Sequence, residues 1–202
     1  MAVKESSKLT EGEEIILRSM FPKGREQTIK EIQKKTPYSS YERNNNYLKS
    51  LARKRIIEEK KIGKTLVYSI IPDILFSQQA FHAYAFDRLQ EFSEKHKIIS
   101  QALKELPQEK IELVLIFGSY AKGAERKESD IDVLVVYSNK EAVEHALTSL
   151  KRRYGLQIHP AIIPKSEFAK IKTENKELWE SFVMHGILFK GYELFYHYAY
   201  AT

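Results

Sequence analysis

Apolar residues recur at helical spacing through the first part of the chain. Ile15, Ile16 and Met20 share one face of a helix expected within residues 11–20, after an acidic first turn that suits the helix dipole. Ile29 and Ile32 share one face of a second helix, which ends before Pro37. The pattern therefore predicts two short helices, each with one buried face.

A third helix and a hairpin are predicted to follow. Ser39 or Ser40 is a suitable N-cap for a helix beginning near Tyr41. The segment "RIIEEKKIGKTLVYSII" then reads as two short strands joined by a turn at Gly63. One face of the third helix carries the apolar side chains Tyr47, Leu48, Leu51 and Ala52, and the outward face is expected to carry Arg43, Asn44, Asn45, Lys49 and Arg53.

Residues 73–107 are expected to form a helical connector of one long helix or two, ending before Pro107. Its apolar stripe contains Ala80, Phe81, Tyr84, Ala85, Leu89 and Phe92, followed by Ile98, Ile99, Ala102, Leu103 and Leu106. This stripe is expected to be core or a homodimer interface rather than a cofactor site. His82 and His96 have no metal-ligand arrangement in the sequence and are interpreted as structural or surface residues.

Two apolar runs in the second half have the length of buried strands. The first is "IELVLIF", which leads directly into Gly118 and Ser119. Gly allows a tight turn, and Ser offers a hydroxyl and an N–H where anions bind well. The second run is "DIDVLVVY", in which Asp130 and Asp132 alternate with apolar residues and so point to the same face.

Composition and charge narrow the function classes. The 202 residues include no cysteine, which excludes disulfides, thiolate zinc sites and thiol nucleophiles. No apolar run approaches the ~20 residues of a membrane span, and the first residues show no apolar signal core, so a cytoplasmic protein is expected. Residues 1–72 hold 16 basic and 9 acidic residues, whereas the remainder is nearly neutral. All of the chain's net charge of +6 therefore comes from residues 1–72, which predicts a first module that faces a polyanion.

The first module resembles winged helix-turn-helix domains in its order of three helices and a hairpin. The resemblance implies that the third helix enters the major groove of double-stranded DNA and that the wing contacts the backbone or the minor groove. The DNA-binding residues would then be Arg43, Asn44, Asn45, Lys49 and Arg53 on the helix, with Lys60, Lys61 and Lys64 on the wing. The alternatives are a solvated helix face with ordinary surface charge, or a module that binds another protein.

The carboxylate pair predicts a divalent cation. Asp130 and Asp132 repel each other unless a cation compensates their charge, and hard oxygen ligands without a nearby His or Cys cluster favour Mg²⁺ over zinc. A metal beside a phosphate-binding turn is the pairing that phosphoryl or nucleotidyl transfer needs. A plain turn followed by an Asp pair that caps a surface strand is the simpler alternative.

The stretch "GSYAKGAERKESDIDVLV" is similar to the signature of the DNA polymerase β-like nucleotidyltransferase superfamily, and of its minimal nucleotidyltransferase branch in particular. Ala121, Gly123 and Ser129 also fit that motif, and the resemblance spans about residues 97–195. It implies a mixed sheet flanked by helices, with NTP as the ligand. Gly118 and Ser119 would contact the phosphates, helped by Lys122 or Arg126, and Asp130 and Asp132 would bind two Mg²⁺ ions, or Mn²⁺ in their place.

Active members of this superfamily use a third carboxylate on a later strand. The matching segment, "YGLQIHPAIIPKSEF", offers Gln157 and His159 at its polar strand positions, and Pro160 is awkward in a central strand. His159 is a candidate catalytic base but cannot supply the missing charge. Glu167 is a candidate substitute from a following loop. Two functions stay open: a Mg²⁺-dependent nucleotidyltransferase, or a DNA-binding regulator with a degenerate transferase fold.

The fold class expected from these patterns is α+β. It comprises a winged helix-turn-helix over residues 1–72, the helical connector over 73–107, and a polymerase β-like nucleotidyltransferase domain over 108–202.

Overall fold

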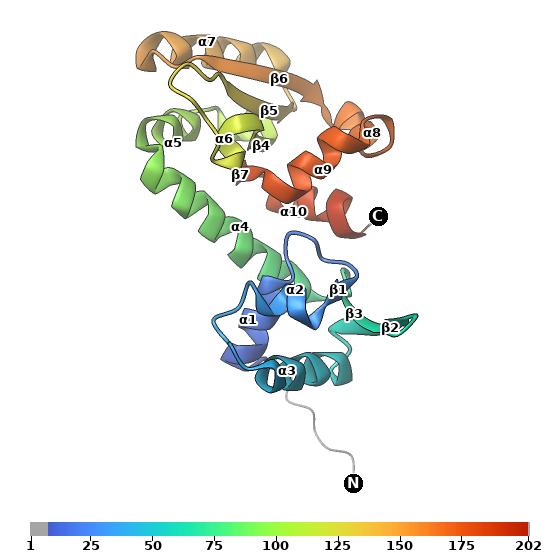
Figure 1. Ribbon diagram of the computed structural model, residues 1–202. Helices are drawn as coiled ribbons and strands as arrows, with labels where there is room; N and C mark the ends of the chain where they lie inside the picture. The colour runs from blue at the N-terminus through green and yellow to red at the C-terminus, as the bar shows by residue number, and fades with distance from the viewer. Residues whose placement is uncertain (1–7, 202) are drawn as a thin grey trace. The chain divides into compact units, whose positions relative to one another are not determined.

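The computed structural model describes residues 8–201; residues 1–7, where no signal core is expected, and Thr202 lie outside that range. The chain forms two compact units, over residues 8–84 and 85–200 (Figure 1). The helix α4 (Leu75–Lys95) contributes its first half to one unit and its second half to the other. In the described part of the chain, no helix is long and apolar enough to cross a membrane.

The first unit contains three helices and a small antiparallel sheet. Its elements are α1 (Glu11–Ser19), β1 (Gln27–Thr28), α2 (Ile29–Gln33), α3 (Tyr41–Arg53), β2 (Ile57–Ile62) and β3 (Thr65–Ile70). The sheet order is β1-β3-β2, and Gly63 lies in the turn between β2 and β3, as expected. The two-residue strand β1 was not anticipated, because two residues carry no detectable period.

The helix starts follow from local hydrogen bonding. Thr10 and Thr28 each form a capping box with the glutamate three residues later, which begins α1 and α2. Ser40, one of the two expected caps, accepts a hydrogen bond from the Arg43 N–H and begins α3. Capping residues thus set where each helix begins.

Asn44 requires a correction. It was expected on the outward face of α3, but it is fully buried. Its side-chain amide donates to the Tyr38 and Ser40 carbonyl oxygens at 2.9 and 2.7 Å, and its oxygen accepts from Thr36 Oγ1 at 3.0 Å. The reason is helical phase: Asn44 lies four residues before Leu48 and so extends the buried stripe of α3.

The second unit is built on a four-stranded mixed sheet of order β6-β5-β4-β7. The central pair β4 (Ile111–Phe117) and β5 (Ile131–Tyr137) is antiparallel, as is the pair of β4 with β7 (Ile187–Lys190). The edge strand β6 (Ile158–Pro164) runs parallel to β5. The other elements are α5 (Lys97–Lys104), a 3-10 turn (Gln108–Lys110), α6 (Gly118–Lys122), α7 (Lys140–Tyr154), α8 (Lys165–Glu174), α9 (Lys176–His185), α10 (Tyr192–Tyr196) and a π-helical turn (His197–Ala201).

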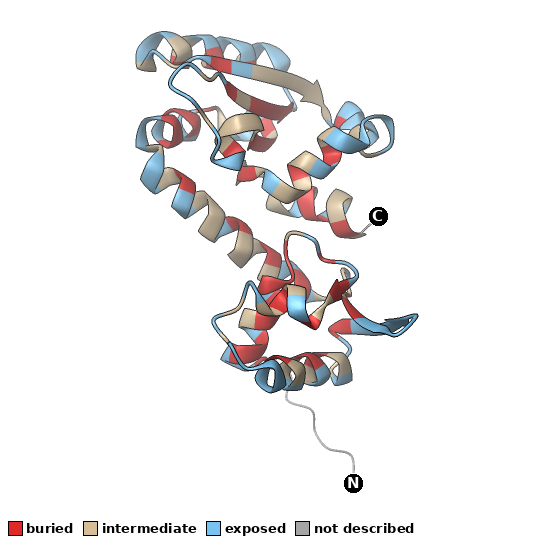
Figure 2. Cartoon of the chain, in the orientation of Figure 1, coloured by how far each residue is buried: buried red, intermediate tan, exposed pale blue. Residues whose placement is uncertain are grey.

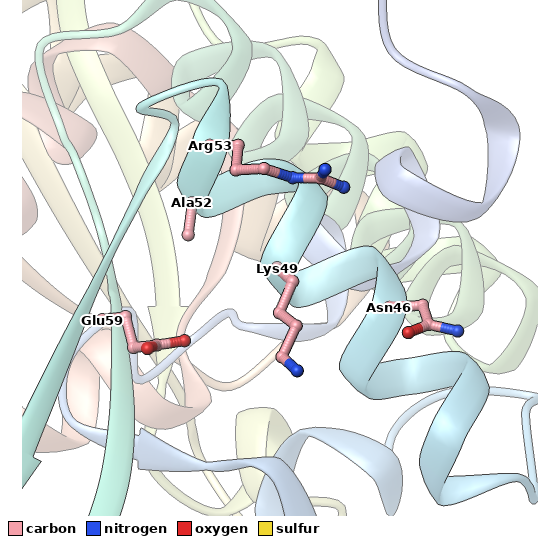
Figure 3. A pocket seen from close by; sticks show the side chains of 5 residues that line it. All are labelled: Asn46, Lys49, Ala52, Arg53 and Glu59. Carbon is pink, nitrogen blue, oxygen red and sulfur yellow. The ribbon is translucent and has the colours of Figure 1, made fainter.

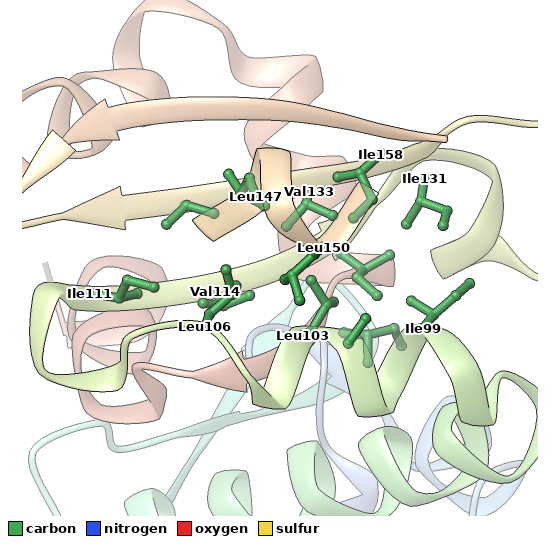
Figure 4. Close-up of a cluster of buried hydrophobic side chains, with 14 of the residues drawn as sticks. Ile99, Leu103, Leu106, Ile111, Val114, Ile131, Val133, Leu147, Leu150 and Ile158 are labelled. Atoms are coloured by element: carbon green, nitrogen blue, oxygen red, sulfur yellow. The ribbon is translucent and has the colours of Figure 1, made fainter. Parts of the chain in front are cut away.

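Helices cover both faces of this sheet. On one face, α5 and α7 pack apolar side chains such as Leu103 and Leu147 against Val114 and Val133 (Figure 4). On the other, α8, α9 and α10 contact β4 and β5. Both central strands are therefore buried, in agreement with their continuous apolar sequences (Figure 2).

Candidate functional site

The Gly-Ser turn and the carboxylate pair meet at one edge of the mixed sheet. Because β4 and β5 are antiparallel, the end of β4 lies beside the start of β5, and Phe117 pairs with Asp132. Gly118 and Ser119 begin α6 directly after β4, and Asp130 directly precedes β5. Residues ten or more positions apart in sequence are thus brought together by strand pairing.

Gly118 and Asp132 are in direct contact. Gly118 has a φ of +69°, which disfavours other residues. A Cβ at this position would lie 2.0 Å from Asp132 Oδ2 and 3.0 Å from its Cγ. The absence of a side chain at Gly118 therefore makes the space that the Asp132 carboxylate occupies, a relation that spacing alone does not reveal.

The ten-residue spacer between the two motifs is an ordered loop with its own hydrogen bonds. Gly123, with a φ of +66°, ends α6, and Ala124 N–H donates to the Ser119 carbonyl at 3.0 Å. Ser129 Oγ accepts from the Arg126 N–H at 2.8 Å, while the Ser129 N–H donates to the Arg126 carbonyl at 3.0 Å. These hydrogen bonds order the loop, which places Asp130 at the edge of the sheet.

His159 lies beside Asp132 at the same edge. The two residues are in register across the parallel pair of β5 and β6, and His159 Nδ1 is 3.4 Å from Asp132 Oδ1. Its side chain is 78% exposed, against 27% for Asp132, so the imidazole faces solvent. Pro160 is accommodated because β6 is an edge strand, where a missing N–H need not break the ladder.

The two cations expected to steady phosphates are both exposed. Lys122 ends α6 and Arg126 stands in the spacer loop. Burial, followed by the charges of Lys122 and Arg88, lowers the pKa of His185 at the end of α9. Helix α6, which ends at Lys122, is in contact with α9. Glu167 is exposed in the first turn of α8.

The donor set fits Mg²⁺ that is also held by a substrate. Residues 8–201 contain no cluster of three or more Asp, Glu or His side chains that could hold a metal on their own. Asp130 and Asp132 supply two hard carboxylates at one edge, and Mg²⁺ is commonly bound by one or two carboxylates together with substrate phosphates. The lack of a side chain at Gly118 leaves the room that one of these carboxylates, Asp132, occupies.

A second candidate site is a groove of about 620 Å³ in the first unit, between α3 and β2. Asn46, Lys49, Ala52, Arg53 and Glu59 line it, and Lys49 and Glu59 extend from the two elements into the space between them (Figure 3). Lys49 and Arg53 were expected to face a ligand, whereas Asn46 and Glu59 were not. The position of Glu59 could have been predicted from the sequence, because Glu59 lies two residues after Ile57 and therefore on the same face of the strand as this buried apolar residue.

The remaining residues expected on this surface differ in exposure. Arg43 is exposed and its guanidinium lies over the Tyr38 ring, 5.1 Å from the centroid, and Asn45 is half-buried. Lys60, Lys61 and Lys64 are exposed on the hairpin. Apart from Asn44, every residue of the expected set therefore has some accessible surface.

The fold and the sheet edge together define a nucleotidyltransferase-like domain. Residues 97–191 match the family described as Polymerase beta, Nucleotidyltransferase. Over 70 residues the chain is 36% identical to "Putative protein adenylyltransferase MJ0604" of Methanocaldococcus jannaschii, covering 34% of this chain and 70% of that protein. The chain belongs to the polymerase β-like nucleotidyltransferase family.

Two solved structures have a similar chain. One is a toxin–antitoxin complex with AMP-PNP, which is 20% identical, covers 52% of this chain and 83% of that chain, and has a TM-score of 0.35. The other is a mutant of the toxin–antitoxin complex MntA-HpeT, which is 21% identical, covers 53% and 83% of the two chains, and has a TM-score of 0.34.

Proposed function

We propose that the second unit is a Mg²⁺-dependent nucleotidyltransferase that moves a nucleoside monophosphate from NTP to an acceptor hydroxyl. The observation that carries this proposal is the contact between Gly118 and Asp132, which joins the phosphate turn to the carboxylate pair at one sheet edge. The name of the Methanocaldococcus jannaschii relative makes ATP the first nucleotide to test and protein hydroxyl groups the first acceptors.

In this proposal each residue has a distinct role. Gly118 and Ser119 bind the phosphates through the start of α6, and Lys122 and Arg126 offset the remaining phosphate charge. Asp130 and Asp132 hold Mg²⁺, or Mn²⁺ in its place. When bound by these two carboxylates, the cation would supply positive charge that offsets the charge of the triphosphate. His159, facing solvent next to Asp132, accepts the acceptor proton as the hydroxyl oxygen bonds to the α-phosphorus and pyrophosphate leaves.

A transfer assay tests the proposal directly. The full chain is incubated with each labelled NTP, Mg²⁺ or Mn²⁺, and candidate acceptors that include the chain itself. Asp130→Asn and Asp132→Asn should abolish label incorporation, whereas Asp73→Asn, which removes an exposed carboxylate of the other unit, should leave it unchanged. Incorporation that survives both site variants would refute the assignment.

A regulator that no longer transfers nucleotides is the second candidate, and one observation favours it. His159 occupies the position in register with Asp132, on the strand where the family resemblance leads one to expect a third carboxylate. His159→Asp separates the two functions. If the wild-type chain binds NTP without transfer and His159→Asp gains transfer, the regulator is correct; if His159→Asp lowers an existing wild-type activity, the enzyme is correct.

We also propose that the first unit is a winged helix that binds double-stranded DNA. Its support is the order of three helices and a hairpin, the three-stranded antiparallel sheet, and the excess of basic residues over residues 1–72. Lys49 and Arg53 line the groove between α3 and β2, where phosphates or base edges would be contacted.

Salt-dependent binding to a duplex tests this second part. Replacing Lys49 and Arg53 by Gln should weaken binding and lower the slope of log affinity against log salt by about 2, one for each lost phosphate contact. Lys104→Gln, which removes an exposed lysine of the other unit, is the control. No binding of the wild-type chain at low salt would refute the DNA proposal and point to a protein partner.

A further inference from the structure

The second half of α4 presents one face to the signature loop. Arg88, Phe92 and His96 follow each other at intervals of four residues, with His96 immediately after the helix, so their side chains form one stripe. All three belong to the second unit, as do α6 and the loop that leads to Asp130. The stripe contacts α6, the following loop, the end of α9 and, through Phe92, Phe189 of β7.

Arg88 fixes the ends of two helices. Its Nη2 donates to the Ala121 carbonyl of α6 at 3.3 Å and to the His185 carbonyl at 2.9 Å, and its Nη1 donates to the Met184 carbonyl at 3.4 Å. Carbonyl oxygens at helix ends lack intrahelical partners, so a guanidinium satisfies them well. Arg88 thereby holds the helix that begins with Gly118 and Ser119 against α9.

His96 contacts both α6 and the spacer loop. Its ring centroid is 5.3 Å from that of Tyr120 in an edge-on arrangement and 4.6 Å from that of Phe92. Its Nε2 is 3.5 Å from Glu125 Oε1. One imidazole therefore touches α6 and, five residues before Asp130, the loop that delivers the carboxylate pair.

Glu125 depends on this contact. Its Oε2 is buried and accepts no hydrogen bond from any residue that the structure describes. The Glu125 side chain is only 21% exposed, and a carboxylate that is partly removed from water is less stable when its partner is deleted. Removing His96 should therefore drive Glu125 toward solvent and pull the loop with it.

We propose that His96 and Glu125 are positioning residues for the nucleotide site. Their pair anchors the loop between Gly123 and Asp130 to the junction of α4 and α5, and so holds the phosphate turn and the carboxylate pair in one geometry. This inference rests on the proposed nucleotidyltransferase site. It also gives a role to a histidine that the sequence places among structural or surface residues.

Four variants of the full chain test it. His96→Phe keeps a ring against Phe92 and Tyr120 but removes the contact with Glu125; Glu125→Gln removes the charge; the double variant removes both. Glu105→Gln is the matched control, because it breaks a contact with Arg153 and Tyr154 in the same unit but away from the loop. The unfolding of the second unit is followed by the fluorescence of Trp179, the single tryptophan of the chain.

Two measurements separate loop anchoring from nucleotide binding. Trypsin cleavage after Lys122, Arg126 and Lys127 under native conditions reports how firmly the loop is held. Calorimetric titration with ATP in Mg²⁺ reports the site. We expect His96→Phe to speed cleavage and to weaken ATP binding about tenfold, the scale of losses from supporting residues at metal sites, with a Trp179 transition like that of Glu105→Gln. The double variant should regain affinity relative to His96→Phe, because no charged carboxylate is left unpaired.

Each other outcome overturns the inference. Equal affinities in His96→Phe and Glu105→Gln, or faster cleavage with unchanged ATP affinity, would leave the pair a merely structural role. A double variant as weak as His96→Phe would assign the effect to the imidazole ring and not to the pair. If the wild-type chain binds no ATP, the proposed function fails and the inference fails with it. That result is distinct from a failure of the inference alone, in which the wild-type chain binds ATP and the variants bind it equally well.

Discussion

Gly118→Ala is the sharpest test of the site, because the change adds one methyl group at the point where its two motifs touch. Gly118 has a φ of +69°, and the new Cβ would lie 2.0 Å from Asp132 Oδ2. A carbon and an oxygen in contact are normally about 3.3 Å or more apart. The Asp132 carboxylate must therefore move by about 1 Å or more, or the turn must open.

The size of the effect follows from that displacement. A misplacement of about 1 Å in an active site costs about 100-fold in rate. Turning the carboxylate alone does not relieve the clash, since the new Cβ would also lie 3.0 Å from Asp132 Cγ and 3.3 Å from its Cβ. The left-handed backbone adds a stability cost of about 1–2 kcal/mol for any residue with a side chain. We expect Gly118→Ala to fold and to lose about 100-fold in nucleotide transfer.

Gly155→Ala is the matched control. Gly155 ends α7 with a φ of +63°, and a Cβ there meets nothing within 4 Å. It therefore carries the backbone strain of Gly118→Ala without the collision. Thermal unfolding of both variants measures the strain, and initial rates of label incorporation measure the site. Calorimetric titration with ATP in Mg²⁺ gives a readout for the site even without turnover.

Similar behaviour of the two alanine variants would contradict this role of the contact between Gly118 and Asp132. Equal rates and equal ATP affinities would mean that the Asp132 carboxylate moves aside at no functional cost, so that its contact with Gly118 does not define the site. A loss in Gly118→Ala that is matched by an equal loss of folded protein would assign the effect to stability.

Three further results are expected in the first unit. Burial of the Glu13 carboxyl would raise its pKa, but hydrogen bonds from Lys54, Thr10 and Ser50 lower the pKa to about 2. The resulting stabilisation of the folded state, about 3 kcal/mol, is present above pH 4.5 and is lost as the pH falls toward 2. Denaturant unfolding followed by circular dichroism should therefore show that Glu13→Gln loses less stability on acidification than the wild-type chain. Glu59→Gln should raise the affinity for duplex DNA several-fold in anisotropy titrations, because it removes a negative charge from the groove. Glu58→Gln should raise it less, because Glu58 pairs with Ser69 on the other face of the strand, away from the groove. Equal gains would mean that Glu59 acts only through the overall charge of the unit. Asn44→Ala should destabilise the unit by about 1–3 kcal/mol in denaturant unfolding, since it leaves buried polar groups unpaired, and an unchanged stability would contradict its role in the core.

Local signals in the sequence were sufficient for much of the fold. The run "IELVLIF" is continuous and short, and it forms the buried central strand β4; the Gly-Ser turn and the Asp pair fall at the ends of β4 and β5. Ser40 and Gly63 mark a helix start and a hairpin turn by their chemistry. These features depend on neighbours in sequence, which is why they were predictable.

Contacts between distant segments were not predictable from the same signals. The sequence could have placed Asn44 on the buried stripe of α3, because Asn44 lies four residues before Leu48, but it does not reveal the carbonyl groups of Tyr38 and Ser40 that accept its hydrogen bonds. Likewise, no spacing rule connects His96 with Glu125, which are 29 positions apart and meet only once α6 has folded against α4. Residues that contact the site residues from other elements, without lining the site themselves, are therefore the ones that the sequence does not reveal.

The position of β6 in the sheet shows how the two kinds of information combine. Pro160 argued against a central strand, and the edge position of β6 removes the conflict, since only one side of an edge strand needs a complete ladder. The same position places His159 beside Asp132, at the sheet edge where Asp130 and Gly118 also lie. His159 thus stands on β6 in register with Asp132, where the family resemblance leads one to expect a third carboxylate, and under the proposed function His159→Asp is the exchange that separates transfer from regulation.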